Sequence, residues 1–172
     1  MVTTAKTIAA FFLKALRERD EKPDRMKIQK LLYYAQGEHL GRYGTPLFAE
    51  EIQAWTYGPV QPDVYHAMKM DEKFQAPLPP QEIIPFLEEI VREYANIPTA
   101  DIMQQTHLER PWIIARGTLA PEESSNAVIS HESMRSFFRK SRSEREEYAR
   151  QMGITGRILE RDHAVWKALA EA

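Results

Sequence analysis

Apolar side chains recur at steps of three and four residues along most of this 172-residue chain. That spacing places them on one face of a helix, so the chain reads as a series of amphipathic helices. The pattern predicts helices over residues 4–19, 25–40, from 62 through 68, 83–94, 99–110 and 131–152, a short helix or turn at 111–117, and a last helix reaching the C-terminus.

Residues typical of helix ends separate these segments. Asp24, Thr99 and Ser130 each precede a helical pattern, and we expect each to accept a hydrogen bond from the free N–H groups of the first turn. Gly41 and Gly44 follow the second pattern, and we expect them to end that helix.

The stretch from Pro46 to Val60 departs from the helical pattern. Apolar and polar residues alternate loosely there, as in a short strand or strand pair. Tyr57-Gly58-Pro59 predicts a turn, because the residue before a proline avoids the helical region. Pro62 then fits the first position of the next helix, where its missing N–H has no cost. We therefore expect a mainly α fold: a single compact helical domain of about seven to eight helices, with a short extended or β segment near residues 47–57.

Composition narrows the classes of partner. A net charge of −2 gives no strong attraction to nucleic acid or to membranes. The lack of cysteine excludes disulfides and thiolate metal sites and fits a reducing compartment. The apolar run from Ile8 to Leu13 is too short to cross a bilayer and lacks a signal-cleavage pattern. We expect a cytoplasmic protein with no membrane partner.

Motifs for catalysis or metal binding are missing from the sequence. The five histidines have no metal-ligand spacing, and no phosphate-binding glycine loop, dinucleotide fingerprint or nucleophile elbow occurs. We expect no enzymatic activity, no metal and no cofactor. One alternative is a hydrolase-like site in the polar and aromatic group of His107, Glu109, Arg110 and Trp112.

Basic residues gather between Arg135 and Arg145, but they alternate with glutamates. Such a run is typical of a solvated helix with pairs four residues apart, such as Arg142 with Glu146. Nothing in it marks a helix that reads bases, so we do not expect a nucleic-acid partner.

Three segments, taken in sequence order, resemble one protein family. They are MKIQKLLYYAQGEHL, with Lys27, Lys30, Leu31, Leu32, Tyr33 and Tyr34; PLFAEEIQAWTYGPVQPDVY, with Pro46, Leu47, Phe48, Ala54, Trp55, Tyr57, Gly58, Pro59 and Val60; and THLERPWIIAR, with Thr106, His107, Pro111 and Trp112. This pattern resembles the Panacea domain, also called the SocA-like antitoxin domain, over about residues 5–140.

The resemblance implies a largely α-helical antitoxin of a bacterial or prophage toxin–antitoxin system. Such a protein is non-enzymatic and neutralises, by direct contact, a toxin encoded next to it. Two alternatives stay open. The protein would be a proteolytic adaptor that delivers the toxin to a Clp-type protease, or a DNA-binding autoregulator of its operon.

The aromatic stretch at residues 52–65, IQAWTYGPVQPDVY, has two interpretations. Its rings would be buried between helices with Trp112 beside them, or partly exposed as an anchor for a partner, since Tyr, Trp and Arg dominate interface hot spots. A rigid corner would allow both. The candidate partner-binding residues are Lys27, Lys30, Tyr34, Trp55, Tyr57, Pro59, Trp112 and Trp166.

Residues 141–172 extend beyond the family pattern. We therefore predict a Panacea-like domain at 1–140 and a helical C-terminal extension at 141–172. The apolar residues of the extension, Trp166 among them, would dock back on the domain, or would bind a toxin or a second copy of the chain in a homo-oligomer.

Overall fold

The computed structural model describes residues 3–19, 24–69 and 76–151. Its elements are α1 (Ala5–Glu18), α2 (Arg25–Tyr43), β1 (Gln53–Trp55), β2 (Gly58–Val60), α3 (Pro62–Lys69), the 3-10 turn η1 (Gln81–Ile83), α4 (Ile84–Tyr94), α5 (Thr99–His107), α6 (Arg110–Arg116) and α7 (His131–Phe138). A further helix occupies residues 142–151. The described chain is compact and mainly α with one small antiparallel strand pair, which confirms the predicted fold class.

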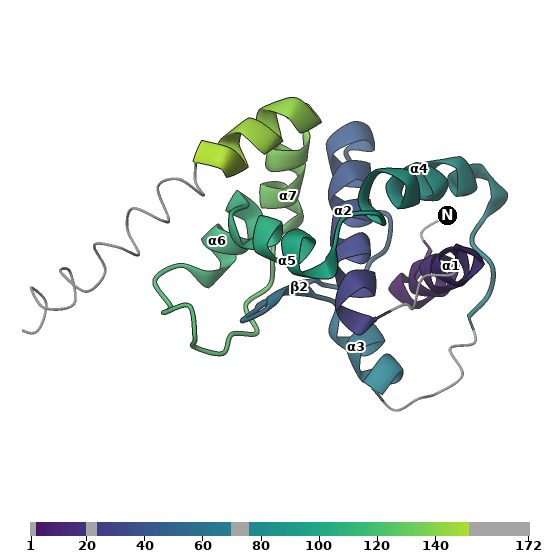
Figure 1. Ribbon diagram of the computed structural model, residues 1–172, viewed down its shortest axis with the longest axis horizontal. Coiled ribbons are helices and arrows are strands. Elements are labelled where there is room, and N and C mark those ends of the chain that lie inside the picture. The colour runs from purple at the N-terminus through teal and green to yellow at the C-terminus, as the bar shows by residue number, and fades with distance from the viewer. Residues whose placement is uncertain (1–2, 20–23, 70–75, 152–172) are drawn as a thin grey trace, which may run out of the picture.

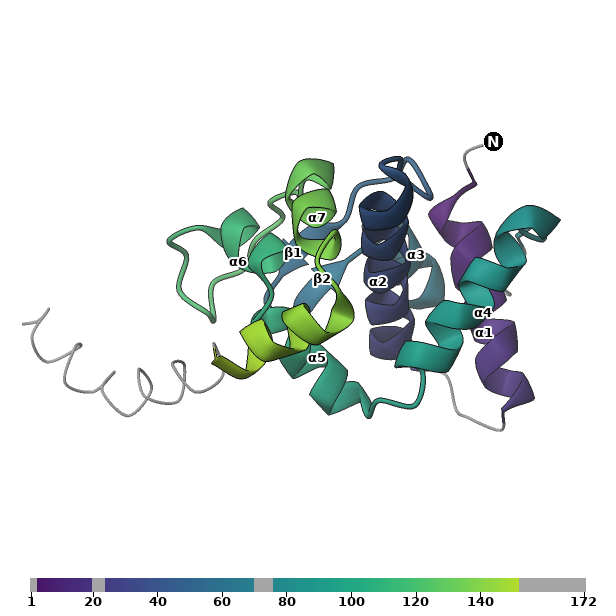
Figure 2. The ribbon, with the colours of Figure 1, turned by 90° about the horizontal axis from the view of Figure 1, so that it is seen from above.

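Helix α2 lies at the centre of the molecule (Figures 1 and 2). It packs against α1, α3, α4, α5, α7 and β2, so side chains on nearly all of its faces are buried. Several of these side chains are polar: Lys27, Gln29, Lys30, Gln36 and Glu38. Buried polar groups need hydrogen-bond partners. Helix α2 therefore contacts neighbouring segments through side-chain hydrogen bonds as well as through apolar packing.

Two glycines let α7 lie directly on α2. A Cβ at Gly37 would lie 2.2 Å from the Phe138 ring, and one at Gly41 would lie 2.5 Å from the Phe138 carbonyl oxygen. The helix therefore continues through Gly41 and ends at Gly44, which has a φ of 75°. The prediction that Gly41 ends this helix was wrong, because that glycine serves close packing.

The predicted helix caps are confirmed at two of three positions. The Asp24 carboxylate accepts from the Lys27 N–H (2.6 Å), and the Ser130 hydroxyl accepts from the first turn of α7 (3.1 Å). The prediction for Thr99 was wrong. The N-cap of α5 is Pro98, and the Thr99 hydroxyl instead donates to Asp24 Oδ2 (2.8 Å).

The predicted β segment is a hairpin with a two-residue turn. Trp55 lies opposite Gly58, so Thr56 and Tyr57 form the turn. The turn predicted at Tyr57-Gly58-Pro59 was placed too late, because Gly58 and Pro59 already belong to β2.

A third extended segment lies along the other edge of β1. The Ala54 N–H donates to the Ala127 carbonyl (2.8 Å), and the Ile129 N–H donates to the Ile52 carbonyl (2.8 Å). The Ala54 N–H points away from β2, so Ala54 and its partner Pro59 are not joined by backbone hydrogen bonds. Proline, which has no N–H, is therefore tolerated at this position of β2.

The predicted helix over 131–152 is two helices in the structure. Helix α7 ends at Phe138, and the next helix follows Ser141. Ser141 and Glu144 form a capping box, in which the Glu144 N–H donates to Ser141 Oγ (3.3 Å) and the Ser141 N–H donates to Glu144 Oε2 (2.8 Å). This Ser-x-x-Glu spacing is visible in the sequence within the highly charged run.

Candidate partner-binding site

The β1–β2 turn carries an exposed tyrosine. Tyr57 is 66% exposed, while the preceding Trp55 is half-buried and packs edge-on against Tyr65 of α3, with ring centroids 5.0 Å apart. A single exposed aromatic residue is common on protein surfaces. The significance of Tyr57 therefore depends on how firmly the turn is held and on what surrounds it.

One later segment holds the backbone before and within the turn. Three consecutive carbonyl oxygens of the hairpin each contact a side chain of residues 107–116: Ala54 with Arg116 Nη1 (3.2 Å), Trp55 with Trp112 Nε1 (2.9 Å) and Thr56 with His107 Nε2 (2.9 Å). The His107 and Trp112 rings also contact each other, with centroids 4.4 Å apart. Turn conformation is thus fixed by side chains from α5 and α6.

Helix α2 holds the second strand. The Lys30 ammonium donates to the Pro59 carbonyl (3.0 Å). Gly58 has a φ of 103°, and a Cβ there would lie 2.7 Å from Lys30 Nζ and 2.8 Å from Thr106 Oγ1. Glycine is therefore required at position 58 both by backbone conformation and by space. Burial lowers the pKa of Lys30 to about 7.

A pair of glutamines continues this support toward α3. Gln29 Nε2 donates to the Gln61 carbonyl (3.2 Å), and the Gln61 N–H donates to Gln29 Oε1 (2.7 Å). The Gln61 side chain in turn accepts from the Val64 N–H at the start of α3 (2.8 Å). The hairpin, α2 and the start of α3 are therefore joined by direct hydrogen bonds.

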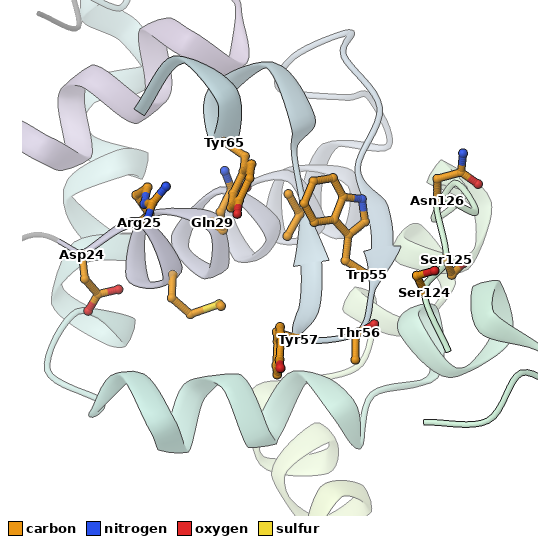
Figure 3. A pocket seen from close by; sticks show the side chains of 12 residues that line it. Asp24, Arg25, Gln29, Trp55, Thr56, Tyr57, Tyr65, Ser124, Ser125 and Asn126 are labelled. Atoms are coloured by element: carbon orange, nitrogen blue, oxygen red, sulfur yellow. The ribbon is translucent and has the colours of Figure 1, made fainter. Parts of the chain in front are cut away.

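A groove of about 910 Å³ opens beside the turn (Figure 3). Its lining comes from α2, the hairpin, α3 and one loop: Asp24, Arg25, Met26, Gln29, Trp55, Thr56, Tyr57, Val60, Tyr65, Ser124, Ser125 and Asn126. Trp55 and Tyr65 lie on one side and Tyr57 on the other, with Arg25 toward one end and Asn126 toward the opposite end. This volume is typical of ligand-binding clefts.

Arg116 shapes the loop that forms one end of this groove. Its Nη2 donates to the carbonyls of Ala120 (2.9 Å), Pro121 (3.3 Å) and Glu123 (2.6 Å). The buried guanidinium also lies over the Trp112 ring, 5.0 Å from its centroid. Arg116 therefore binds both the Ala54 carbonyl of the hairpin and the loop that leads to Asn126.

Behind the site lies a buried carboxyl group. Tyr34 donates its hydroxyl to Glu109 Oε1 (2.9 Å) and stacks on Tyr94, with ring centroids 4.2 Å apart. Burial raises the pKa of Glu109 to about 7. Glu109 does not line the groove, so its raised pKa concerns the stability of the fold.

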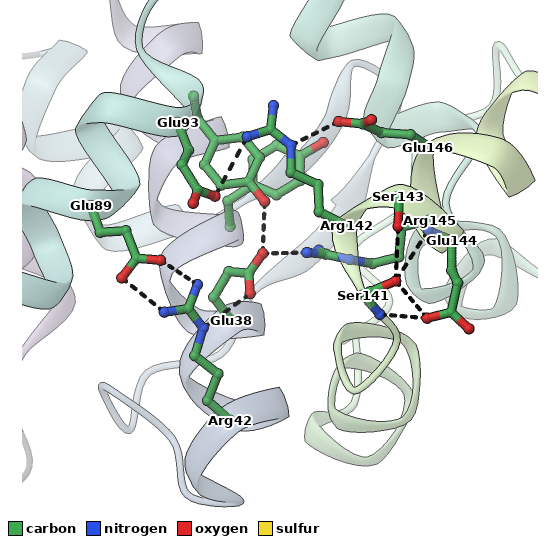
Figure 4. A network of polar contacts seen from close by, with 12 residues as sticks. Glu38, Arg42, Glu89, Glu93, Ser141, Arg142, Ser143, Glu144, Arg145 and Glu146 are labelled. Carbon is green, nitrogen blue, oxygen red and sulfur yellow. Dashed lines mark hydrogen bonds and ion pairs between the residues drawn. The ribbon is translucent and has the colours of Figure 1, made fainter.

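Three arginines of the run from Arg135 to Arg145 form ion pairs, and Figure 4 shows those of Arg142 and Arg145. Buried Arg145 pairs with Glu38 of α2, and Glu38 also accepts from the Tyr94 hydroxyl (2.7 Å). Arg142 contacts Glu93 of α4 (3.5 Å) and Glu146 (2.7 Å), the pair expected four residues on. The predicted extension beyond residue 140 thus begins with a helix that forms ion pairs with α2, through Arg145, and with α4, through Arg142.

The described part of the chain offers little material for chemistry. None of the described residues that line the groove is a histidine. Among the residues that the structure describes, no three His, Cys, Asp or Glu side chains are grouped to hold a metal. Within the same ranges, no helix is both long and apolar enough to cross a membrane. The arrangement is suited to binding through aromatic surface and hydrogen bonds.

Comparison with known proteins identifies the family. Residues 28–113, half of the chain, match the family described as "Antitoxin SocA-like, Panacea domain". The chain belongs to this family. It is 38% identical over 61 residues to a protein named "Antitoxin SocA" from Caulobacter vibrioides (strain NA1000 / CB15N), over 36% of this chain and 32% of that protein. The match thus spans about a third of the length of that relative. No solved structure matches this chain.

The structure brings together the three motifs of the Panacea domain, but it buries most of the candidate residues. Lys27, Lys30, Tyr34, Pro59 and Trp112 are all buried. Lys27 donates to carbonyl oxygens after α4, including that of Ala95 (2.9 Å). These five side chains support the fold and the hairpin, so a surface formed by Lys27 and Lys30 is not available in this structure.

Of the remaining candidates, Trp55 and Tyr57 line the groove. Trp166 lies outside the described residues. Sequence reasoning missed Arg25, Met26 and Tyr65 as companions of the turn. The helical step from Met26 to Gln29 was the available signal, but only the fold shows which face of α2 meets the hairpin.

Proposed function

We propose that this Panacea-domain protein is an antitoxin that neutralises a toxin encoded next to it by direct binding at the groove beside the β1–β2 turn. The observation that carries this proposal is the exposed Tyr57 on a turn held by Trp112 and His107. Family membership supports the antitoxin role, and the groove supplies a surface for it.

Rigidity of the turn favours a binding role. A side chain that is already positioned loses less conformational freedom on association, and more of its contact energy appears as affinity. Tyr57 sits next to three backbone carbonyls that are fixed by hydrogen bonds from α5 and α6. Tyrosine and tryptophan in such positions are the residue types that dominate interface hot spots.

The DNA-binding alternative gains no support from the basic run. Arg135, Arg142 and Arg145 each lie within ion-pair distance of a glutamate, whereas Arg139 and Lys140 are exposed. A helix that neutralises phosphates needs unpaired cations along one face. Arg139 and Lys140 alone do not form such a face, so we propose protein binding.

Co-expression with the adjacent open reading frame tests the proposal. The tagged protein should capture the neighbouring gene product at a fixed stoichiometry and restore growth when that product is toxic. Rescue should persist in a host that lacks Clp-type proteases, which separates occlusion of the toxin from delivery for degradation. Rescue without any capture of the toxin would overturn direct neutralisation.

A further inference from the structure

We propose that the groove beside the β1–β2 turn binds an extended segment of the toxin that carries a large apolar or aromatic side chain close to a carboxylate. This inference rests on the proposed function and specifies what the groove recognises. Three features of the groove support it: its charge, its aromatic walls and its unpaired hydrogen-bonding groups.

The exposed cation of the groove provides donors for an acidic ligand. Among the residues that the structure describes, Asp24 and Arg25 are the charged side chains that line it. Each oxygen of Asp24 accepts one hydrogen bond within the fold, from the Lys27 N–H and from the Thr99 hydroxyl. Arg25 is exposed and contacts only the Tyr65 ring, 5.6 Å from its centroid, among the residues that the structure describes. Its guanidinium therefore keeps its donors for a carboxylate.

The walls of the groove favour a large apolar or aromatic side chain. Trp55 and Tyr65 meet edge to face on one side, Tyr57 stands opposite, and Met26 contributes a flexible thioether (Figure 3). Aromatic rings prefer offset or edge-to-face neighbours, and methionine adapts to irregular apolar shapes. A side chain inserted here would contact aromatic surface on two sides.

The far end of the groove favours an extended backbone. The side chains of Ser124 and Asn126 make no hydrogen bond within the described ranges. Both are exposed on the loop whose path Arg116 fixes. This hydroxyl and this amide, two residues apart, can pair with peptide N–H and C=O groups, whereas a nucleic-acid strand would need several cations along its backbone. The described lining of the groove contains one cation, Arg25.

Selection of peptides tests the inference without knowledge of the toxin. Random linear peptides displayed on phage are panned against the full chain, with no counter-selection on Arg25 variants. We expect enriched sequences that combine Phe, Tyr, Trp or Leu with a nearby Asp or Glu. A synthetic selected peptide should lose about tenfold or more in affinity when its acid is replaced by the amide, and also when the protein carries Arg25→Glu.

A matched control is Arg150→Glu, because Arg150 is also exposed but lies outside the groove. This variant should bind the selected peptide as the wild type does. Enriched peptides without acids, or equal binding by Arg25→Glu, would overturn the inference.

Toxin capture separates failure of this inference from failure of the proposed function. Capture of the full toxin by Arg25→Glu at wild-type strength overturns the acidic-segment inference and leaves the proposed function standing. No capture by the wild type overturns the proposed function itself. Thermal unfolding of Arg25→Glu should match the wild type, since Arg25 has no hydrogen bond in the described structure.

Discussion

Trp112 donates its indole N–H to the backbone carbonyl of Trp55, 2.9 Å away and 57 residues earlier in the chain. This bond joins the third motif of the family to the second. The two tryptophans have different roles. Trp112 is buried and holds the turn, whereas Trp55 is half-buried and lines the groove.

Trp112→Phe should destabilise the protein by about 1–2 kcal/mol, because it keeps a ring but removes the indole N–H that binds the Trp55 carbonyl. Urea unfolding measures the change. Trp55→Phe is the matched control, since it loses only a part-buried bond to Gln53, and its cost should be smaller. An equal loss of stability in both variants would contradict the bracing role of Trp112.

Gly58→Ala should destabilise by about 2 kcal/mol or more beyond Gly44→Ala. Both glycines have positive φ values, 103° and 75°, so both substitutions introduce backbone strain. A methyl group at 44 meets nothing within 4 Å, whereas one at 58 meets Lys30 Nζ and Thr106 Oγ1. The difference between the two variants in thermal or urea unfolding reports the contacts with Lys30 and Thr106 together with the larger backbone strain at a φ of 103°. Equal costs would show that Lys30 and Thr106 yield without penalty.

Periodicity predicted the helical fold because each helix buries an apolar stripe that repeats locally in sequence. α1 and α4 follow this rule. The rule does not show which residues of α2 are buried. That helix packs against six elements, and its lysine and glutamine side chains are buried together with the apolar ones. Lys30 looked like a surface residue, since a buried amine depends on an acceptor, the Pro59 carbonyl, that only the fold supplies.

Arg145→Met should lower the free energy of unfolding by about 3 kcal/mol, because it leaves the buried Glu38 carboxylate without one of its cations. Arg150→Met is the control, since its pair with Glu147 is exposed and should contribute little. Calorimetry of both variants checks this. A small effect at Arg145 would mean that the helix at 142–151 adds no stability to α2.

Stability should depend on pH through Glu109. Burial raises the pKa of Glu109 from 4.5 to about 7 in the folded protein. Between these values the folded state binds more protons than the unfolded state, so stability falls as the pH rises toward about 7. Glu109→Gln cannot titrate, and its stability relative to the wild type should therefore improve over this range by an amount on the order of 3 kcal/mol.

Urea unfolding at pH 4.5 and pH 7.5 measures this difference. Glu88→Gln serves as the control, because Glu88 is exposed on α4, and it should follow the wild type at both values. Burial lowers the pKa of Lys30 from 10.5 to about 7, so its titration changes stability mainly above pH 7. All three proteins contain Lys30, so this effect does not distinguish them. Parallel curves for Glu109→Gln and the wild type would contradict the assignment.

The groove itself was only partly predictable. The aromatic stretch indicated Trp55 and Tyr57, since a turn crowded with aromatic residues has little to pack against locally. Arg25 and Tyr65 become their neighbours only because the hairpin folds against α2 and α3 through the Gln29–Gln61 pair. Such contacts depend on tertiary packing and leave no periodic signal in sequence.

The dissociation constant of the purified protein with its toxin, measured for Tyr57→Ala and Tyr43→Ala, tests the binding site most directly. The two tyrosines are similarly exposed, at 66% and 59%, and Tyr43 lies at the end of α2, outside the groove. Tyr57→Ala should weaken binding by about 2 kcal/mol or more, as expected for an aromatic hot spot, and Tyr43→Ala should leave it unchanged. Equal affinities for both variants, or a loss only at Tyr43, would contradict toxin binding at the hairpin groove.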